Sequence, residues 1–265
     1  MQFDTPLTAG LLIKRYKRFL ADISLTDTVM DSDDTTENIT TVYCPNTGSM
    51  KNCQPPGARV WCSLSDNKKR KHALTWEIVE VPAVSDASNE KTGQMNHLVG
   101  INTHRANSLV EEAINKDIIN ELKGYATLCR EVKYGTRSRI DFVLKDHPKQ
   151  PDCYIEVKNV TLGEADGKGL FPDAVTSRGT RHLHELIKIK QQGMRAVLFF
   201  CVQHTGIRYV TPATEIDPQY SDALIKADAA GVEILAYSAT VTPTMIQLTQ
   251  PLPVRIPSKT SCSYT

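Results

Sequence analysis

Two carboxylates and a lysine near the middle of the chain are the residues best suited to chemistry. Asp141 lies in the run Ser138–Leu144. A proline-containing loop follows, and Glu156 and Lys158 lie in the next run, Tyr154–Lys158. Two neighbouring carboxylates repel each other unless a cation lies between them, and oxygen ligands suit Mg²⁺ or Mn²⁺ rather than zinc. Such an ion can polarise a phosphodiester oxygen and activate water, while Lys158 orients that water or stabilises developing charge. The pattern indicates metal-assisted phosphodiester hydrolysis.

The two runs predict a β-hairpin that brings these side chains together. Apolar residues occupy alternate positions on both strands: Ile140, Phe142, Leu144, Ile155 and Val157. Because side chains alternate between the faces of a sheet, we expect Asp141, Glu156 and Lys158 on the opposite, polar face. A turn near residues 148–149 places Asp141 across from Glu156. The alternative is an ordinary surface salt-bridge cluster, because the D…E-x-K spacing is short and common.

The helix predicted before this hairpin could supply a third carboxylate. It runs from Thr103, as its N-cap, to about Lys116 and carries one apolar stripe. Glu111 and Glu112 flank that stripe symmetrically, so helical phase does not choose between them. Four acidic residues are therefore candidates: Glu111, Glu112, Glu121 and Glu131.

A second helix, predicted over about Arg178–Gln192, offers a phosphate site at its N-terminus. Thr176 or Ser177 would cap it, and Arg178 and Arg181 lie in its first turn. Free N–H groups and the positive end of the helix dipole favour an anion there. An amphipathic helix with ordinary caps explains the same spacing by packing alone.

Residues 1–101 predict a small β domain. Turn residues separate five β-favouring runs: Leu11–Leu25, Ile39–Cys44, Arg59–Leu64, Leu74–Val81 and His97–Ile101. Five short strands suggest a small barrel or sandwich, and one such shape, the OB-fold, binds nucleic-acid strands on an open face.

Residues 102–250 predict a mixed α/β domain. Beyond the hairpin strands, runs at Leu128–Tyr134, Ala196–Val202 and Val232–Tyr237 favour strands, and Asp217-Pro218 begins a third helix. The order of strands and helices indicates a mixed sheet. The tail, residues 251–265, is rich in Pro, Ser and Thr and is expected to be extended or disordered.

A net charge of +1 means that attraction to nucleic acid must come from local clusters. Two clusters stand out: Lys14, Arg15, Lys17 and Arg18, and then Lys68, Lys69, Arg70 and Lys71 with His72. Either cluster alone is explained equally well by a solvated charged surface. The acidic stretch Asp31–Glu37 is typical of a solvated insertion.

Cysteine usage and hydropathy indicate a cytoplasmic protein without a membrane partner. The seven cysteines are dispersed and form no C-x-x-C pair, so we expect reduced, mostly structural thiols. The longest apolar run, Ala196–Val202, is far too short to span a membrane. The N-terminal charge order is wrong for a secretory signal.

Several motifs together resemble the sugar fermentation stimulation (SfsA) family over nearly the whole chain. The motifs lie at Leu12–Asp22, Cys44–Met50, Ser138–Phe142, Tyr154–Lys158 and Phe171–Thr176, with the Arg-Gly and His-Leu-x-Glu-Leu sequence that follows. The resemblance implies an OB-type domain followed by a PD-(D/E)xK nuclease-like domain. It also implies DNA as the partner and a link to regulation of sugar-utilisation genes.

Carried over residue by residue, the resemblance implies Asp141, Glu156 and Lys158 as the core and favours Glu112 over Glu111. Val157 joins Asp141 and Glu156 as an expected ligand of Mg²⁺ or Mn²⁺. Further residues are expected to line the site or contact DNA: Asn46, Thr47, Arg139, Thr176, Arg178 and His182. The chain departs from the family pattern in loops, at Asp31–Glu37 and Ser85–Gln94.

Two functions fit these observations. The first is a DNA-binding protein whose divalent-metal site cleaves phosphodiester bonds. The second is a non-catalytic transcriptional regulator that uses the nuclease fold only as a DNA cradle. Strand preference and oligomeric state stay open, with a homodimer among the options.

Overall fold

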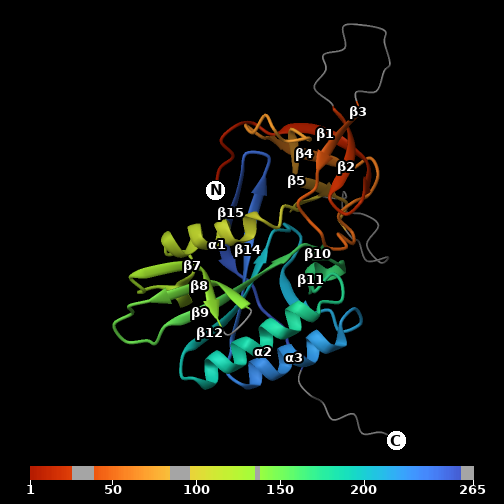
Figure 1. The fold of residues 1–265 in the computed structure, drawn as a ribbon. Helices are drawn as coiled ribbons and strands as arrows, with labels where there is room; N and C mark the ends of the chain where they lie inside the picture. The colour runs from red at the N-terminus through yellow and green to blue at the C-terminus, as the bar shows by residue number, and fades with distance from the viewer. Residues whose placement is uncertain (26–38, 84–95, 135–137, 258–265) are drawn as a thin grey trace, which may run out of the picture.

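A closed barrel forms the first domain of the computed structural model, which describes residues 1–25, 39–83, 96–134 and 138–257 (Figure 1). The strands are β1 (Thr8–Tyr16), β2 (Leu20–Leu25), β3 (Ile39–Tyr43), β4 (Arg59–Leu64), β5 (Leu74–Val81) and β6 (His97–Gly100). They are ordered β3-β2-β1-β4-β5-β6, and a parallel bridge from Tyr43 to Thr75 joins β3 to β5. That bridge closes β1–β5 into a five-stranded barrel, which confirms the predicted small barrel.

The predicted run Leu11–Leu25 is two strands rather than one. Lys17 and Arg18 adopt positive φ values of 48° and 63° and turn the chain between β1 and β2. Strand propensity continues through this turn, so the sequence gives little sign of it. Inside the barrel, Leu12, Ile23 and Trp76 are fully buried, together with three free thiols: Cys44, Cys53 and Cys62.

The second domain is a mixed sheet, as predicted, and it has six strands where the sequence predicted five: β15 was missed. Its order is β15-β14-β12-β9-β8-β7. The strands are β7 (Thr127–Tyr134), β8 (Ser138–Lys145), β9 (Cys153–Val160), β12 (Arg195–Val202), β14 (Glu233–Thr242) and β15 (Met245–Pro251). The central strands β9, β12 and β14 run parallel, and β7, β8 and β15 are antiparallel to their neighbours.

Helices cover both faces of this sheet. Helix α1 (Arg105–Asn115) lies on the face nearer the barrel, and α2 (Ser177–Gln191) and α3 (Pro218–Ala229) lie on the other (Figure 1). Asp217 caps α3, as predicted, by accepting from the N–H of Tyr220. Thr103 does not cap α1: the N-cap is His104, because the Thr103 hydroxyl donates to the carbonyl of Pro45. In the described residues, no helix is long and apolar enough to cross a membrane.

A small three-stranded sheet was not anticipated from the sequence. It contains β10 (Leu162–Gly163), β11 (Lys168–Phe171) and β13 (Tyr209–Pro212). Two short 3₁₀ turns, Asn120–Leu122 and Ala165–Gly167, complete the elements. The chain after β15 runs extended beside β13, where the N–H of Arg255 donates to the carbonyl of Val210 and the Arg255 guanidinium stacks on Tyr209. Residues 258–265 lie outside the described part.

The two domains are joined by polar contacts at one edge. The hydroxyl of Ser49 and the N–H of Met50 donate to the carboxylate of Asp173, at 3.1 Å each. The Asn52 amide donates to the carbonyl of Gly163, and the Cys53 thiol lies 3.2 Å from the carbonyl oxygen of Thr161. These contacts fix the barrel loop 45–53 against the chain between β9 and α2.

Candidate active site

The β8–β9 hairpin has the predicted register and opens at the predicted site. The ladder pairs Leu144 with Cys153 and Phe142 with Ile155, so Asp141 and Glu156 occupy the next opposed positions. The ladder stops there. Instead of strand pairing, the carboxylate of Asp141 accepts the N–H of Val157 at 2.7 Å.

The expectation of one apolar and one polar hairpin face is wrong. Phe142 and Leu144 pack in the core beneath α1, but Ile140 and Val143 pack in the core beneath α2 and α3. Both faces are buried because helices cover both sides of the sheet, as is usual where parallel strands form its centre. The polar residues therefore lie where the strands separate, rather than on a solvated face.

Asp141 is held from the α1 side. Its Oδ1 accepts from the Asn107 side chain at 2.9 Å, and its Oδ2 accepts from Val157. Burial raises the pKa of Asp141 above its ordinary value, and the negative charge of Glu156 raises it further. The two hydrogen bonds offset only part of this cost. Asp141 is thus a half-buried carboxylate that lacks a full complement of positive charge.

Glu156 is held from the α2 side. It is 3% exposed, and its Oε1 accepts from Lys158 Nζ at 2.5 Å and contacts His182 Nδ1. Burial raises the pKa of Glu156, but the His182 hydrogen bond and the Lys158 charge outweigh it and leave the pKa below its ordinary value. Both donors share one oxygen; within the described chain no donor reaches Oε2.

His182 links Glu156 to the first turn of α2. Arg178 Nε donates to His182 Nε2 at 3.4 Å, which requires a lone pair on Nε2. The proton is therefore assigned to Nδ1, where it can be donated to Glu156. His182 consequently acts as a buried connection between a surface guanidinium and the central carboxylate.

The protein's own side chains, rather than a free anion site, surround the N-terminus of α2. The Thr176 hydroxyl accepts the N–H of Gly179 at 3.0 Å, which confirms the predicted N-cap. The backbone N–H of Thr176 donates to the buried carboxylate of Asp217 at 2.8 Å. Thr176 therefore has a structural role, and the Asp217 charge disfavours a phosphate at that point. Arg178 and Arg181 are exposed nearby.

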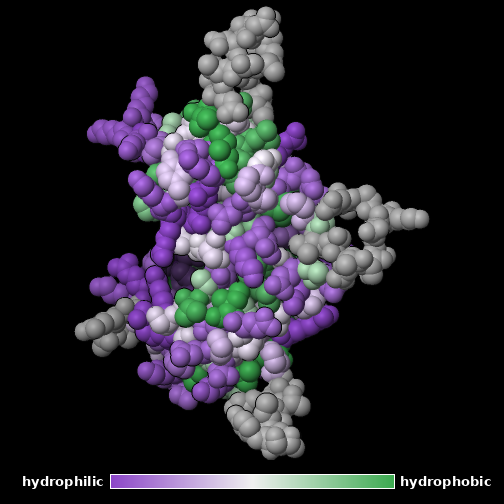
Figure 2. Space-filling view, turned by 90° about the vertical axis from the view of Figure 1, so that its right-hand side faces the viewer, coloured by the Kyte–Doolittle hydropathy of each residue, from purple (hydrophilic) through white to green (hydrophobic). Residues whose placement is uncertain are grey.

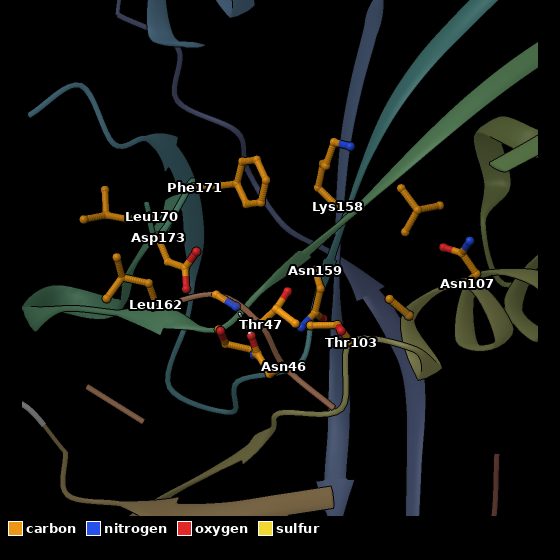
Figure 3. Close-up of a pocket in the computed structure, with 14 residues that line it drawn as sticks. Asn46, Thr47, Thr103, Asn107, Lys158, Asn159, Leu162, Leu170, Phe171 and Asp173 are labelled. Atoms are coloured by element: carbon orange, nitrogen blue, oxygen red, sulfur yellow. Dashed lines mark hydrogen bonds between the residues drawn. The ribbon is translucent and has the colours of Figure 1, made fainter. Parts of the chain in front are cut away.

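A pocket of about 260 Å³ lies between the barrel loop and the second domain, beside the hairpin opening. Its lining includes Asn46 and Thr47 from the barrel, Asn107 from α1, and Lys158 and Asn159 from β9. Figure 3 shows these side chains with the Phe171 ring between Lys158 and Asp173. Figure 2 shows a hollow with a hydrophilic rim at the level where the two domains meet.

The structure does not bring Glu112 or the other third-carboxylate candidates to this cluster. Glu112 binds the terminal amine of Met1 and Lys116 Nζ, and Glu111 binds Arg130. Glu121 accepts from the Tyr237 hydroxyl, and Glu131 is exposed on β7. Asn107 is the α1 residue that contacts Asp141, because it lies more than one helical turn before Glu112 and projects toward the hairpin opening.

Arg15 proves to be a structural residue of the first basic cluster. Its Nη2 donates to three backbone carbonyls, those of Arg18, Asn46 and Gly48, at 2.6, 2.8 and 3.0 Å. These bonds join the β1–β2 turn to the loop that lines the pocket. Arg15 is therefore not available as a free phosphate contact, although it places its neighbours beside the pocket rim.

The remaining basic residues divide by exposure. Lys14, Lys17 and Arg18 are exposed around the β1–β2 turn, with Lys14 3.8 Å from Asp22. Lys68 and Lys69 are exposed on the β4–β5 turn, whereas Arg70 stacks on Tyr43 and donates to Thr75. Arg139 is exposed on β8. The acidic stretch Asp31–Glu37 and the stretch Ser85–Gln94 lie outside the described residues.

Sequence reasoning missed three site residues. Asn107, Asn159 and Asp173 line the pocket, and Asn107 also contacts Asp141. Asn159 directly follows Lys158 and Asp173 stands in the Phe171–Thr176 motif, so position was a usable signal for both. Asn107 gave no signal, because an asparagine on a helix is ordinary surface chemistry.

The donor types at the hairpin opening are those that a hard divalent cation prefers. Asp141 and Glu156 supply carboxylate oxygens, and the Val157 carbonyl faces the same opening as its N–H, because both groups of one strand residue point the same way. Within the described residues, no group of three or more His, Cys, Asp or Glu side chains could hold a metal. Two carboxylates and a carbonyl, completed by water, are a donor set that Mg²⁺ accepts.

Comparisons with known proteins agree with this architecture. The family model described as "Sugar fermentation stimulation protein RE domain" matches residues 104–245, and "SfsA N-terminal OB domain" matches residues 13–87. Sugar fermentation stimulation protein homologs of Shewanella pealeana and Shewanella baltica (strain OS185) are 51% and 52% identical over 257 residues, covering 97% of this chain and 100% of each relative. The structure of Pyrococcus furiosus SfsA in complex with Ca²⁺ is similar, with a TM-score of 0.78 and 25% identity, covering 97% of this chain and 98% of that one.

Proposed function

Because this chain belongs to the sugar fermentation stimulation protein family, and because its hairpin opening gathers a hydrolytic set of residues, we propose that it binds DNA and cleaves phosphodiester bonds with a divalent cation. One observation carries the proposal. Asp141 and Glu156 stand at opposed positions where the β8–β9 ladder ends, and Lys158 lies 2.5 Å from Glu156.

The charge balance of the site supports a bound cation. The pKa of Asp141 is raised by burial and by the charge of Glu156, so ionisation of Asp141 costs more in the metal-free folded protein than in the unfolded chain. Asp141, Glu156 and the Val157 carbonyl would hold the ion, and the Pyrococcus furiosus relative was solved with Ca²⁺. Bound there, Mg²⁺ or Mn²⁺ would supply Lewis-acid polarisation of the scissile phosphate.

Lys158 would stabilise charge in the transition state, and His182 would position the Glu156 carboxylate. Lys158 carries its ammonium beside Glu156, from where it can stabilise negative charge that develops on phosphate oxygens. His182 positions Glu156 from α2, and Arg178 positions His182. Because the cluster is largely buried, these interactions are screened less by solvent than surface pairs are.

The barrel would hold the DNA strand that leads to this site. Arg15 ties the β1–β2 turn to Asn46 and Gly48 on the pocket rim, and Lys17 and Arg18 are exposed on the same turn. A strand crossing this rim would pass from the exposed cations to the hairpin opening. Basic side chains along a groove provide the sequence-independent part of nucleic-acid affinity.

A non-catalytic DNA-binding regulator is the second candidate. One observation favours it: Glu156 already contacts two basic side chains, Lys158 and His182, so its charge is balanced without a metal. The relatives carry the name sugar fermentation stimulation protein. For this chain, the corresponding proposal is a regulator of sugar-utilisation genes. In that role the hairpin opening would contact the phosphate backbone without cleaving it.

The deciding experiment incubates the purified protein with labelled single- and double-stranded DNA in Mg²⁺, Mn²⁺ or a chelator. Glu156→Gln is the test variant, and Glu164→Gln, in a surface ion pair with Lys168, is the matched control. We expect metal-dependent cleavage by the wild type and Glu164→Gln, and loss of about two orders of magnitude or more in Glu156→Gln. Binding without cleavage in every metal would favour the regulator.

A further inference from the structure

The pocket beside the hairpin opening has the chemistry of a nucleobase site rather than a phosphate site. Three amide side chains line it, those of Asn46, Asn107 and Asn159. Each carries a donor and an acceptor, and one of the two is already bonded within the protein: Asn46 Oδ1, Asn107 Nδ2 and Asn159 Oδ1. The lining also includes the Phe171 ring and the apolar side chains of Leu162 and Leu170 (Figure 3). Neutral amides beside an aromatic ring recognise planar heterocycles, which combine polar edges with apolar faces.

Asn159 presents a polar atom that the protein does not satisfy. Its Oδ1 accepts from the buried Gln203 amide at 2.6 Å, and its Nδ2 and the Gln203 Oε1 are both buried without a partner in the described part of the chain. A buried amide donor without a partner is costly, so a water molecule or a ligand atom is expected beside it. Asn159 lines the pocket, so a rotation of its side chain away from Gln203 would present this donor to a carbonyl or ring nitrogen of a ligand.

The aromatic wall is rigid. Phe171 packs against Phe200 and Tyr220, with ring centroids 5.6 and 5.3 Å apart, and it is only partly buried. These contacts hold one ring face in place. In Figure 3 its ring lies at the side of the pocket nearest Lys158. An aromatic ring held by its own core contacts is a stacking platform that loses little entropy on binding.

The size and position of the pocket restrict the ligand. At about 260 Å³ it is slightly smaller than typical ligand pockets, which span roughly 300–1,000 Å³, so it suits a single small ring system. Val157, Lys158 and Asn107 line the pocket, and Asn107 and the Val157 N–H also contact Asp141. The pocket is therefore directly adjacent to the Asp141 carboxylate.

We propose that this pocket receives one unstacked base of the nucleic-acid strand whose phosphate lies at Asp141 and Glu156. This inference rests on the proposed function and adds a recognition step to it. One base leaves the stack, lies against Phe171 and accepts from Asn159. Its sugar then directs the adjoining phosphate toward Lys158. The barrel loop completes the pocket through Asn46 and Thr47, so binding requires both domains.

Thr47→Trp tests the pocket. Thr47 is exposed on the barrel loop and lines the pocket, so an indole there occupies the space for a base without disturbing a core. Thr240→Trp, the same change at an exposed residue outside the lining, is the matched control. The probes are a twelve-residue thymidine oligonucleotide and a base-free sugar–phosphate oligomer of equal length, titrated by fluorescence anisotropy in Ca²⁺.

We expect Thr47→Trp to weaken binding of the thymidine oligonucleotide by roughly 5- to 150-fold, the effect of losing one stacked base, and to leave the base-free oligomer unchanged. Equal effects on both probes, or no effect on either, would overturn the inference. Cleavage by the wild type with no base-dependent effect of Thr47→Trp would reject the base pocket and leave the nuclease standing. A base-dependent effect without cleavage in Mg²⁺ or Mn²⁺ would reject the nuclease and keep the pocket.

Discussion

The hairpin opening and the β1–β2 turn of the barrel are both charged, yet they are built in opposite ways. At the opening, Asp141, Glu156 and His182 are buried or half-buried, and each is fixed by a named partner. At the turn, Lys17 and Arg18 are exposed. Arg15 is the exception there, because it is committed to three backbone carbonyls.

This difference matches two proposed roles: catalysis at the hairpin opening and electrostatic binding of DNA at the β1–β2 turn. Chemistry requires groups held in one geometry with little solvent screening, so the fold must provide partners on several elements. Electrostatic attraction to a polyanion requires only cations near the path of its backbone. Mobile side chains therefore reduce its affinity little. Changes at the opening should therefore have large, position-specific effects, and changes at the turn should have small, graded ones.

The largest expected effect is on cleavage by Lys158→Met, which keeps the length of the side chain and removes its charge. We expect a loss of roughly 100- to 1,000-fold in turnover, because one preorganised electrostatic contact to the transition state is removed. Single-turnover cleavage of labelled DNA measures it. Lys149→Ala, an exposed lysine on the loop of the same hairpin, should cleave normally. A loss below about threefold in Lys158→Met would place the chemistry elsewhere.

Arg15→Ala should change stability rather than charge attraction. Three hydrogen bonds from a guanidinium to backbone carbonyls would be lost, and we expect the free energy of unfolding to fall by about 2 kcal/mol. Urea denaturation monitored by tryptophan fluorescence measures this. Arg59→Ala, whose exposed guanidinium stands over Trp61, should cost much less. If Arg15→Ala were as stable as Arg59→Ala, the basic turn would not be anchored as described.

Asp141→Asn should stabilise the metal-free protein in a pH-dependent way. The folded-state pKa of Asp141 is raised, so between the ordinary aspartate pKa and that raised value the folded protein holds a proton that the unfolded chain has lost. Wild-type stability from this group is present at low pH and falls as pH rises through the window. We therefore expect little difference between the proteins at low pH and a gain for Asp141→Asn at neutral pH.

Chelator-treated samples in thermal unfolding across pH measure the effect. Adding Ca²⁺ at neutral pH should raise the melting temperature of the wild type and leave that of Asp141→Asn nearly unchanged, since the variant lacks a ligand. A variant that is less stable than the wild type at neutral pH without metal would contradict the assignment of Asp141 as an unfavourable buried charge.

The smallest expected effect belongs to Lys17→Ala. If Lys17 neutralises one phosphate, its removal should reduce the slope of log binding constant against log salt by about 0.7 on a single strand and about 0.9 on a duplex. Titrations at several salt concentrations measure the slope. Lys149→Ala should leave it unchanged. Equal slopes for Lys17→Ala and the wild type would remove the β1–β2 turn from the strand path.

Much of the architecture followed from local patterns. Alternation and turn residues predicted β4 and β5 with the bounds that the structure has, and Asp217-Pro218 predicted the start of α3. The sequence did not predict the short strands β10, β11 and β13, because two to four residues are too few to show a periodicity. The predicted polar face was wrong because helices cover both faces, so Val143 is buried beneath α2 and α3. Ile140 departs from alternation itself: it packs with Val143 rather than with Phe142, beyond the point where the β8–β9 pairing ends.

By itself, the sequence determined which residues oppose each other at the hairpin: a loop of fixed length and strand alternation set Asp141 against Glu156, and both are local properties of the chain. Only the tertiary structure decided their partners. Asn107 reaches Asp141 from α1, His182 reaches Glu156 from α2, and Asp173 draws the barrel loop over the pocket. These contacts join residues distant along the chain, and helix and strand packing rather than local preference determines which of them meet.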